Sequence, residues 1–169
     1  MSEYFKYLKT TVLFCFTASM LNLLALFACQ KGYLLFAQQF TAQTIACVIH
    51  FFGLPAMRYD TVIYLKNTDW IVNSECTAVS IMIIFFCLVA FYQTSLKAKI
   101  IGVCVGLPII FAANILRFVI MAYIDKHKPV YLVHFHNSLW QIVFIVMAVL
   151  MWMIWIASVA KRDTKTAHR

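Results

Sequence analysis

Three residues with reactive side chains stand beside three different apolar segments of this sequence. Cys76 directly precedes an apolar run, Arg117 lies near the far end of the next run, and His136 comes just before the last one. Together, these residue types can carry out acyl transfer. A thiolate attacks a carbonyl, an imidazole moves the proton, and a guanidinium stabilises the negative charge that develops. This chemistry requires that the segments around them bring the three side chains to one place.

The composition indicates a membrane protein. Hydrophobic residues make up 64% of the chain and charged residues only 12%, and the uncharged runs are too long for one soluble core of this size. The first run, 12–29, resembles a signal peptide, but no small-x-small cleavage pattern follows it, so we interpret it as a retained helix. The formal charge of +8 comes from basic residues at the ends of apolar runs. Membrane topology explains such clusters, so we expect no nucleic-acid partner.

The apolar pattern predicts an all-α integral membrane protein with four transmembrane helices, formed by one domain that covers residues 1–169. The four segments long enough to cross about 30 Å of hydrocarbon are 12–29, 77–96, 100–124 and 138–160. A fifth segment, 33–52, carries central glutamines and threonines and predicts an amphipathic helix in the interface. Segment 55–73 places β-branched and aromatic residues around a polar turn, which predicts a small exoplasmic β-hairpin.

The distribution of basic residues predicts the orientation of these helices. With four spans and a cytoplasmic amino terminus, the inner basic residues are Lys6, Lys9, Lys97, Lys99, Lys161, Arg162, Lys165 and Arg169. The basic residues of the outer segments are largely balanced by acidic ones, as the positive-inside rule requires. We therefore expect a multi-pass protein of the cytoplasmic (inner) membrane with both termini in the cytoplasm. Cys76 and His136 then lie on the exoplasmic face.

Each candidate residue has a structural explanation beside the functional one. An arginine inside an apolar helix costs free energy and usually has a function or a partner, but Arg117 could also extend toward the interface. Asn114 shares its helix face and could orient it, or could be a helix-packing amide. Cys76 could be inert. Its place at a helix start, with an arginine and a histidine nearby, would favour the nucleophilic thiolate.

The histidines before the last span do not indicate a metal site. His134 and His136 would share one face of an extended segment, as metal ligands could, but no carboxylate or second cysteine has suitable spacing nearby. We expect no metal and no cofactor. His134 remains a supporting candidate beside His136.

The sequence resembles the exosortase/archaeosortase family of multi-pass membrane cysteine proteases or transpeptidases. The resemblance covers "FFGLPAMRYDTVIYL", "VNSECTAVS", "NILR" and "FHNSLW", from Ile49 to the end of the last span. It implies that Cys76 is the nucleophile, Arg117 the essential arginine and His136 the acid/base residue. The family pattern Cys-Ser-Gly is Cys-Thr-Ala here, and Trp140 replaces a common glycine. Archaeal members have arginine at the histidine position, so the chain resembles the bacterial exosortases.

The family resemblance also implies a substrate. Such enzymes act on membrane-anchored proteins that carry a carboxyl-terminal sorting signal, made of a short motif, a transmembrane helix and a basic cluster. The expected function is cleavage and sorting of these proteins through a thioacyl-enzyme, at a bond close to the membrane surface, while the bundle recognises the substrate helix within the lipid bilayer. One alternative is a four-helix membrane thiol oxidoreductase, but that needs paired outer cysteines and Cys76 is the only candidate. The other is a non-enzymatic transporter or assembly subunit that uses Arg117 as a substrate or lipid site.

Overall fold

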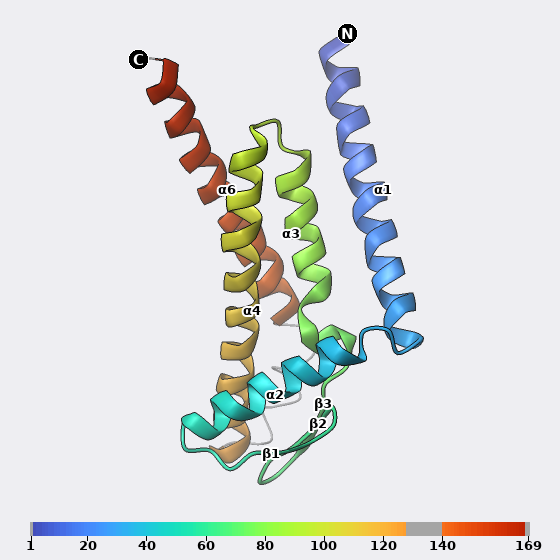
Figure 1. The fold of residues 1–169 in the computed structure, drawn as a ribbon, viewed down its shortest axis with the longest axis vertical. Coiled ribbons are helices and arrows are strands. Elements are labelled where there is room, and N and C mark those ends of the chain that lie inside the picture. Colours follow the sequence, from blue (N-terminus) through green and yellow to red (C-terminus); the bar gives the residue numbers. More distant parts are fainter. Residues whose placement is uncertain (1, 128–139, 168–169) are drawn as a thin grey trace.

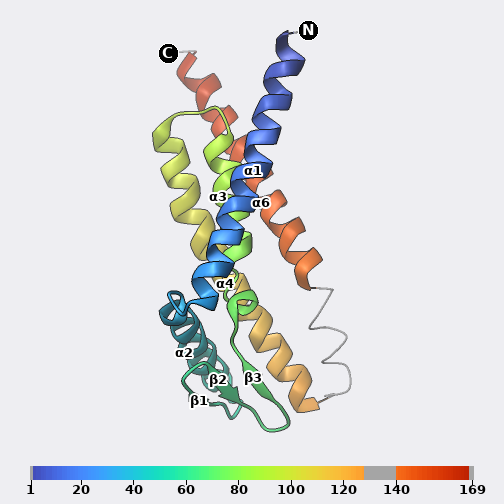
Figure 2. The same cartoon turned by 90° about the vertical axis from the view of Figure 1, so that its right-hand side faces the viewer.

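The computed structural model describes residues 2–127 and 140–167, which form a helical bundle with a smaller layer across one end. The bundle helices in this part of the chain are α1 (Ser2–Gln30), α3 (Val79–Phe91), α4 (Leu96–His127) and α6 (Trp140–Ala167). Figures 1 and 2 show α2 (Leu35–Phe51) lying across the bundle axis, next to a small sheet. The start of α1 and the end of α6 both lie at the opposite end of the bundle, on different sides of it (Figure 1).

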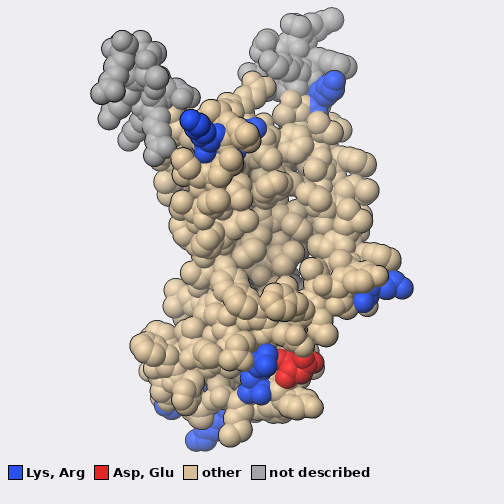
Figure 3. All heavy atoms as spheres, viewed as in Figure 1, with Lys and Arg blue, Asp and Glu red and all other residues tan. Residues whose placement is uncertain are grey.

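Three helices among the described residues are long and apolar enough to cross a membrane, and they contain the segments Leu8–Gln30, Leu96–His127 and Ile142–Val159. The expected count of four spans is therefore not confirmed. The missing one is α3, whose 13 residues extend only about 20 Å at 1.5 Å per residue. On the face shown in Figure 3, the charged side chains lie toward the two ends of the molecule, with an uncharged band between them. This distribution suits a protein embedded in a bilayer.

The segment 77–96 forms a shorter helix than its apolarity predicts because both of its ends leave the α conformation. The short 3-10 helix Ser74–Thr77 precedes it, and Ala78 then adopts left-handed angles, with φ of 58°. At the other end Tyr92 is extended, and a turn leads into α4. Lys99 Nζ donates to the Ala90 carbonyl across 2.6 Å, so a side chain from α4 satisfies one of the last carbonyls of α3.

The sheet has three antiparallel strands in the order β1-β2-β3, formed by Met57–Tyr59, Val62–Tyr64 and Asp69–Ile71. The predicted hairpin around the polar turn is β2 and β3, where Tyr64 pairs with Asp69. The prediction of a single hairpin was incomplete because β1 adds a third strand through a tight turn at Asp60, whose φ is 55°. Asp60 tolerates this backbone since short polar residues are among those that visit the left-handed region.

Helix α2 packs one face against the bundle end and leaves the other outside. Its buried residues recur at helical spacing: Thr41, Ala42, Ile45, Ala46 and Ile49. Phe36, Phe40 and Phe51 are exposed, which is the apolar outward face expected of an interfacial helix. The structure therefore has a helix where the amphipathic segment was predicted, lying across the bundle rather than along it (Figure 1).

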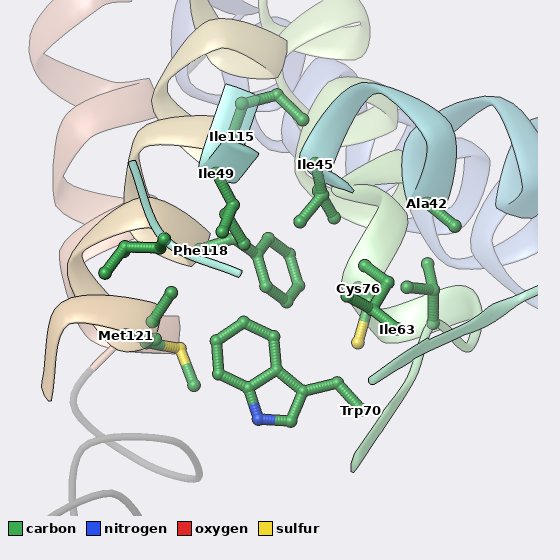
Figure 4. Packing of buried hydrophobic residues seen from close by; sticks show 12 residues of the cluster. Ala42, Ile45, Ile49, Ile63, Trp70, Cys76, Ile115, Phe118 and Met121 are labelled. Atoms are coloured by element: carbon green, nitrogen blue, oxygen red, sulfur yellow. The ribbon is translucent and has the colours of Figure 1, made fainter. Parts of the chain in front are cut away.

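We call the layer formed by residues 35–77 and the last turns of α4 the cap. Its core combines residues from α2, the sheet and α4, including Ile45, Ile63, Trp70 and Phe118 (Figure 4). Helix α4 has 32 residues and is therefore about 48 Å long, so it runs through the bundle and continues into the cap. The β2–β3 turn is fixed to its end, where Thr68 donates its hydroxyl hydrogen to the buried Asp125 carboxylate across 2.9 Å.

Two glycines set the packing in the part of the bundle away from the cap. A Cβ atom at Gly106 would overlap the Phe85 ring of α3, and one at Gly102 would lie 2.6 Å from the Trp155 indole of α6. These glycines form a G-x-x-x-G pattern, which allows close helix approach in membranes. The indole Nε1 of Trp155 also donates to the Ala98 carbonyl of α4.

Candidate active site

Cys76 lies in the 3-10 helix Ser74–Thr77, between β3 and α3. The preceding Asn73 has an extended backbone and caps this turn, because its side-chain Oδ1 accepts from the Cys76 amide across 3.2 Å. Its backbone carbonyl accepts from the same amide at 3.1 Å. Ala78 then turns the chain into α3 through its left-handed backbone. Ala78 is the position at which the Cys-Ser-Gly pattern has glycine, and this backbone is the one that glycine adopts without steric cost.

The Cys76 side chain belongs to the core of the cap. It is 5% exposed, and its Sγ atom lies 3.9 Å from the Ile71 carbonyl oxygen. Figure 4 shows it among residues of α2, the sheet and α4, with Ile63 and Trp70 nearby. All six cysteines lie in the described part of the chain, and none of them forms a disulfide. The surroundings of this thiol are therefore apolar and enclosed.

Asn114 of α4 connects the bundle to the residue Cys76. Its amide Nδ2 donates to the Cys76 backbone carbonyl across 2.7 Å, and Asn114 is fully buried. The sequence left open whether this amide orients Arg117 or packs helices together, and in the structure its hydrogen bond reaches a residue 38 positions earlier in the chain. The second polar atom of the side chain, Oδ1, is buried and has no hydrogen-bond partner.

Arg117 lies one turn beyond Asn114 on the same helix. It is 8% exposed, so protein atoms rather than solvent surround it. Its guanidinium carbon lies 4.9 Å from the centre of the Phe118 ring and 5.9 Å from that of Phe144, within the range of cation–π attraction. Its Nε atom is buried without a hydrogen-bond partner. A negative charge on the Cys76 thiolate would attract the positive Arg117 guanidinium, so the two residues are close enough to interact electrostatically.

The depth of Arg117 follows from the length of α4. At 1.5 Å per residue, Arg117 lies about 32 Å from Leu96, where the helix begins. That distance is close to the thickness of the hydrocarbon core, about 30 Å. The basic Lys97 and Lys99 stand in the first turn of α4. Arg117 therefore stands where the bundle meets the cap, which is nearer to one membrane surface than to the bilayer centre.

A cavity of about 340 Å³ adjoins Arg117 and Asn114. Residues of α1, α3, α4 and α6 form its wall, together with Ala78: Leu26, Ala78, Ser80, Ile81, Asn114, Arg117, Phe144 and Ile145. Most of these side chains are apolar. Cys76 is not among the described residues that line it, because its side chain lies in the cap core. The Asn114 amide stands between the cavity and the Cys76 carbonyl.

His134 and His136 lie outside the described residues, so the structure does not place the expected acid/base residue. Trp140, the first described residue after them, packs against the cluster that contains Cys76. The described part of the chain contains no group of three histidine, cysteine, aspartate or glutamate side chains that could hold a metal ion. The described part of the candidate site is thus Cys76, Asn114 and Arg117.

Sequence reasoning missed two residues, one that positions Cys76 and one that holds the β2–β3 turn of the cap. One is Asn73, whose signal was an N-cap residue type three positions before the thiol. The other is Asp125, which stands at the end of α4 and holds the polar turn through Thr68. Asn67 also donates from Nδ2 to the Asp125 backbone carbonyl across 2.7 Å. The polar composition of the turn was visible in the sequence, but its partner 58 residues away was not.

Comparison with known proteins identifies the family. No curated protein and no solved structure gives a significant match to the chain. The family model described as transmembrane exosortase (Exosortase_EpsH) matches residues 3–155. This match includes the cap, Cys76, Asn114 and Arg117, together with the segment that carries His136. The chain, with its apolar bundle and its thiol at the cap, therefore belongs to the transmembrane exosortase family.

Proposed function

We propose that this membrane protein is a cysteine peptidase or transpeptidase that processes proteins with a carboxyl-terminal transmembrane sorting signal. The observation that carries the proposal is the connection between Cys76 and the Asn114–Arg117 turn of α4. Cys76 of the cap and the buried amide and guanidinium of α4 stand where the bundle joins the cap, and the amide is hydrogen-bonded to the Cys76 backbone carbonyl. Family membership supports a role in protein processing and sorting.

The proposed reaction begins with the Cys76 thiolate. Its sulfur forms a bond to the carbonyl carbon of the substrate peptide, and the C–N bond then breaks. His136 gives a proton to the leaving amine, which leaves a thioester on Cys76. Water or another amine attacks that thioester and releases the thiol. In this scheme the Arg117 guanidinium favours the thiolate and stabilises the oxyanion that forms on the substrate carbonyl oxygen.

The position of the Cys76 side chain adds one requirement to this scheme. The thiol lies in the cap core, whereas Arg117 lines the cavity in the bundle. A substrate in the cavity is therefore attacked after the Cys76 side chain rotates about χ1, away from Ile63 and Trp70. The backbone of Cys76 can stay in place, held by Asn73 and Asn114.

Substitution of the nucleophile tests the proposal. Cys76→Ala should abolish processing of a tagged sorting-signal substrate while the protein still accumulates in the membrane. Cys104→Ala is the matched control, because Cys104 is an exposed residue of α4 away from the site. Equal processing by the two variants would disprove the cysteine mechanism. That result would favour the transporter or assembly subunit, in which Arg117 binds a ligand but Cys76 has no chemical role.

The thiol oxidoreductase alternative makes a different prediction. It requires a cysteine pair that cycles between dithiol and disulfide, whereas none of the six cysteines, all in the described residues, forms a disulfide in the structure. Mass spectrometry of the protein purified under air, after alkylation of free thiols, checks this directly. Cys76 should be recovered alkylated rather than in a disulfide.

A further inference from the structure

A second cavity, of about 370 Å³, lies between α4 and α6 in the half of the bundle away from the cap. Both helices pack against α3 but make far fewer contacts with each other, and Figure 1 shows α6 inclined to α4. The wall extends from Ala98 to Ile109 on α4 and from Met151 to Val159 on α6, and it includes Phe85 of α3. We call this cavity the α4–α6 groove. It opens sideways to the lipid, because several of its wall residues are exposed: Ile101, Val105, Ile109 and Ile154.

The α4–α6 groove has the depth of one lipid leaflet. Its wall residues on α4 cover a rise of about 16 Å at 1.5 Å per residue, which is about half of the hydrocarbon core of ~30 Å. One end of the groove lies at the membrane surface, because Leu96 begins α4 and Val159 ends the apolar span of α6. The groove therefore extends from one membrane surface to the bilayer centre, as the acyl chain of a phospholipid does.

The α4–α6 groove is too narrow for another helix. Spread over about 16 Å, its volume of about 370 Å³ gives a mean cross-section of roughly 23 Å². An α-helix about 10 Å across has a cross-section of roughly 80 Å². Gly102 and Gly106 could bring a second helix close, but they already receive the Trp155 and Phe85 rings of this chain. A single extended chain fits this space better than a helix does.

The polar groups of the wall are already hydrogen-bonded within the protein. Ser158 Oγ donates to the Ile154 carbonyl across 2.9 Å, and Trp155 Nε1 donates to the Ala98 carbonyl across 3.3 Å. The other side chains that line the groove, among the described residues, are apolar. A polar group placed there would lose its hydrogen bonds to water without gaining new ones. The part of a ligand that occupies the groove is therefore hydrocarbon.

The surface end of the groove is positively charged. Lys97 is exposed and stands one turn before Ile101, on the face of α4 that lines the groove. In the sequence of α6, Lys161 and Arg162 follow shortly after Val159. On the face shown in Figure 3, the coloured charged side chains at this end are all basic, whereas acidic ones are seen at the cap. Basic residues beside a groove between membrane helices favour anionic lipid headgroups.

We propose that the α4–α6 groove binds one anionic phospholipid, with an acyl chain along the groove and the headgroup phosphate beside Lys97. The site is separate from Cys76 and does not depend on the proposed reaction. In the predicted topology it takes its lipid from the cytoplasmic leaflet. The bound lipid fills the space that α4 and α6 leave between them, so it stabilises the folded bundle by mass action.

Native mass spectrometry of the full-length protein in a mild detergent measures this binding. The probes are dioleoylphosphatidylglycerol, which is anionic, and dioleoylphosphatidylcholine, which is zwitterionic. We expect one phosphatidylglycerol per chain, bound at least about fivefold more tightly than phosphatidylcholine. Lys97→Gln should remove most of this preference, because one lysine near the lipid surface contributes about that factor. Lys66→Gln, at an exposed lysine of the cap, should leave the preference unchanged.

Two neighbouring isoleucines of α4 provide a matched steric test. Ile100 and Ile101 are 52% and 47% exposed, but only Ile101 lines the groove. Ile101→Trp should weaken phosphatidylglycerol binding at least about fivefold, because it overfills the occupied groove. Ile100→Trp should stay within about twofold of the unmodified protein.

Three outcomes would overturn the lipid site. Equal affinity for the two lipids, retained by Lys97→Gln, would mean that the headgroup is not recognised. Equal weakening by the two tryptophan variants would mean that the bound lipid belongs to a non-specific shell around the bundle. A dimer of this chain in place of the lipid adduct, lost in Ile101→Trp but kept in Ile100→Trp, would assign the groove to a second copy. Lys97→Gln alters no packed residue, so a loss of preference in that variant cannot come from misfolding.

Discussion

The Asn114 side chain donates from Nδ2 to the backbone carbonyl of Cys76 across 2.7 Å, in a fully buried position. This hydrogen bond joins the cap to the bundle at the residue we propose as the nucleophile. The Asn73 cap holds the amide of the same residue. The two asparagines thus hold both the N–H and the C=O of Cys76, which keeps its backbone in place.

Loss of the Asn114 amide should loosen the turn that holds Cys76. Asn114→Leu keeps a similar side-chain volume but leaves the buried Cys76 carbonyl without this donor, at a cost of about 1–3 kcal/mol. We expect a thiol reagent to label Cys76 at least about fivefold faster, because about 1.4 kcal/mol corresponds to a factor of ten in the open population and about 1 kcal/mol to about a factor of five. The measurement is the labelling rate in detergent of a protein that retains Cys76 alone.

Asn22→Leu is the matched control for that experiment. Asn22 also carries a buried, unpartnered Oδ1, but its Nδ2 donates to Ala18 of its own helix. Its replacement should leave the labelling rate of Cys76 unchanged. Equal acceleration in both variants would mean that general destabilisation, rather than the contact with Cys76, controls access to the thiol.

Replacement of Arg117 by lysine should separate catalysis from helix anchoring. The flat guanidinium contacts the Phe118 and Phe144 rings, and a compact ammonium reproduces neither this stacking nor its fixed donors. We expect Arg117→Lys to accumulate normally but to process substrate about 100-fold more slowly or worse. Arg58→Lys on the exposed strand β1 serves as the control. Near-normal turnover by Arg117→Lys would remove the guanidinium from the proposed mechanism.

Because the backbone of Ala78 is left-handed, we predict that its replacement by glycine does not destabilise the protein. The left-handed conformation costs an L-residue about 1–2 kcal/mol, which glycine avoids. Loss of the buried methyl group offsets about 0.8 kcal/mol of that gain. The melting temperature of the Ala78→Gly variant should therefore equal or exceed that of the unmodified protein. Ala112→Gly, at an exposed position within α4, should lower the unfolding free energy by about 1 kcal/mol. Thermal unfolding in one detergent compares them, and a lower melting temperature for Ala78→Gly would contradict the argument.

The close approach of α4 to α3 predicts that Gly106 tolerates no side chain. A methyl group there meets the Phe85 ring, so Gly106→Ala should destabilise the protein by about 1–3 kcal/mol. The double variant Gly106→Ala/Phe85→Leu should lose less than the sum of the two single changes, with a coupling energy above about 0.5 kcal/mol. Unfolding curves of the three variants provide this cycle. Additive losses would show that Gly106 acts through something other than the Phe85 contact.

The orientation in the membrane remains a prediction that two lysines can test. Lys66 is exposed in the β2–β3 turn of the cap, and Lys97 is exposed at the opposite end of α4. In a background without cysteines, Lys66→Cys should react with a membrane-impermeant maleimide in intact cells. Lys97→Cys should react only after lysis, because the basic residues around it favour the cytoplasm. The reverse pattern would place the cap in the cytoplasm.

Local features of this protein were predictable from the sequence. Long uncharged runs indicated membrane helices, the glutamines and threonines of 33–52 set that segment apart, and the polar turn marked the β2–β3 hairpin. The short motifs around Cys76 and Arg117 indicated the family that the comparison then showed. These predictions succeeded because residue type and spacing act within a few positions along the chain, where helix period and turn chemistry operate.

The tertiary structure alone decided which residues meet. The contact of Asn114 with Cys76 joins residues 38 positions apart, and that of Asn67 with Asp125 joins residues 58 apart. Such partners depend on how helices pack, which propensity does not encode. The structure also showed that α3 is too short to be counted as a span. The 3-10 turn at Cys76 and the left-handed Ala78 precede its first residue and delay the start of the helix. Helix packing also made the cavity beside Arg117, since its wall needs residues of α1, α3, α4 and α6 in place.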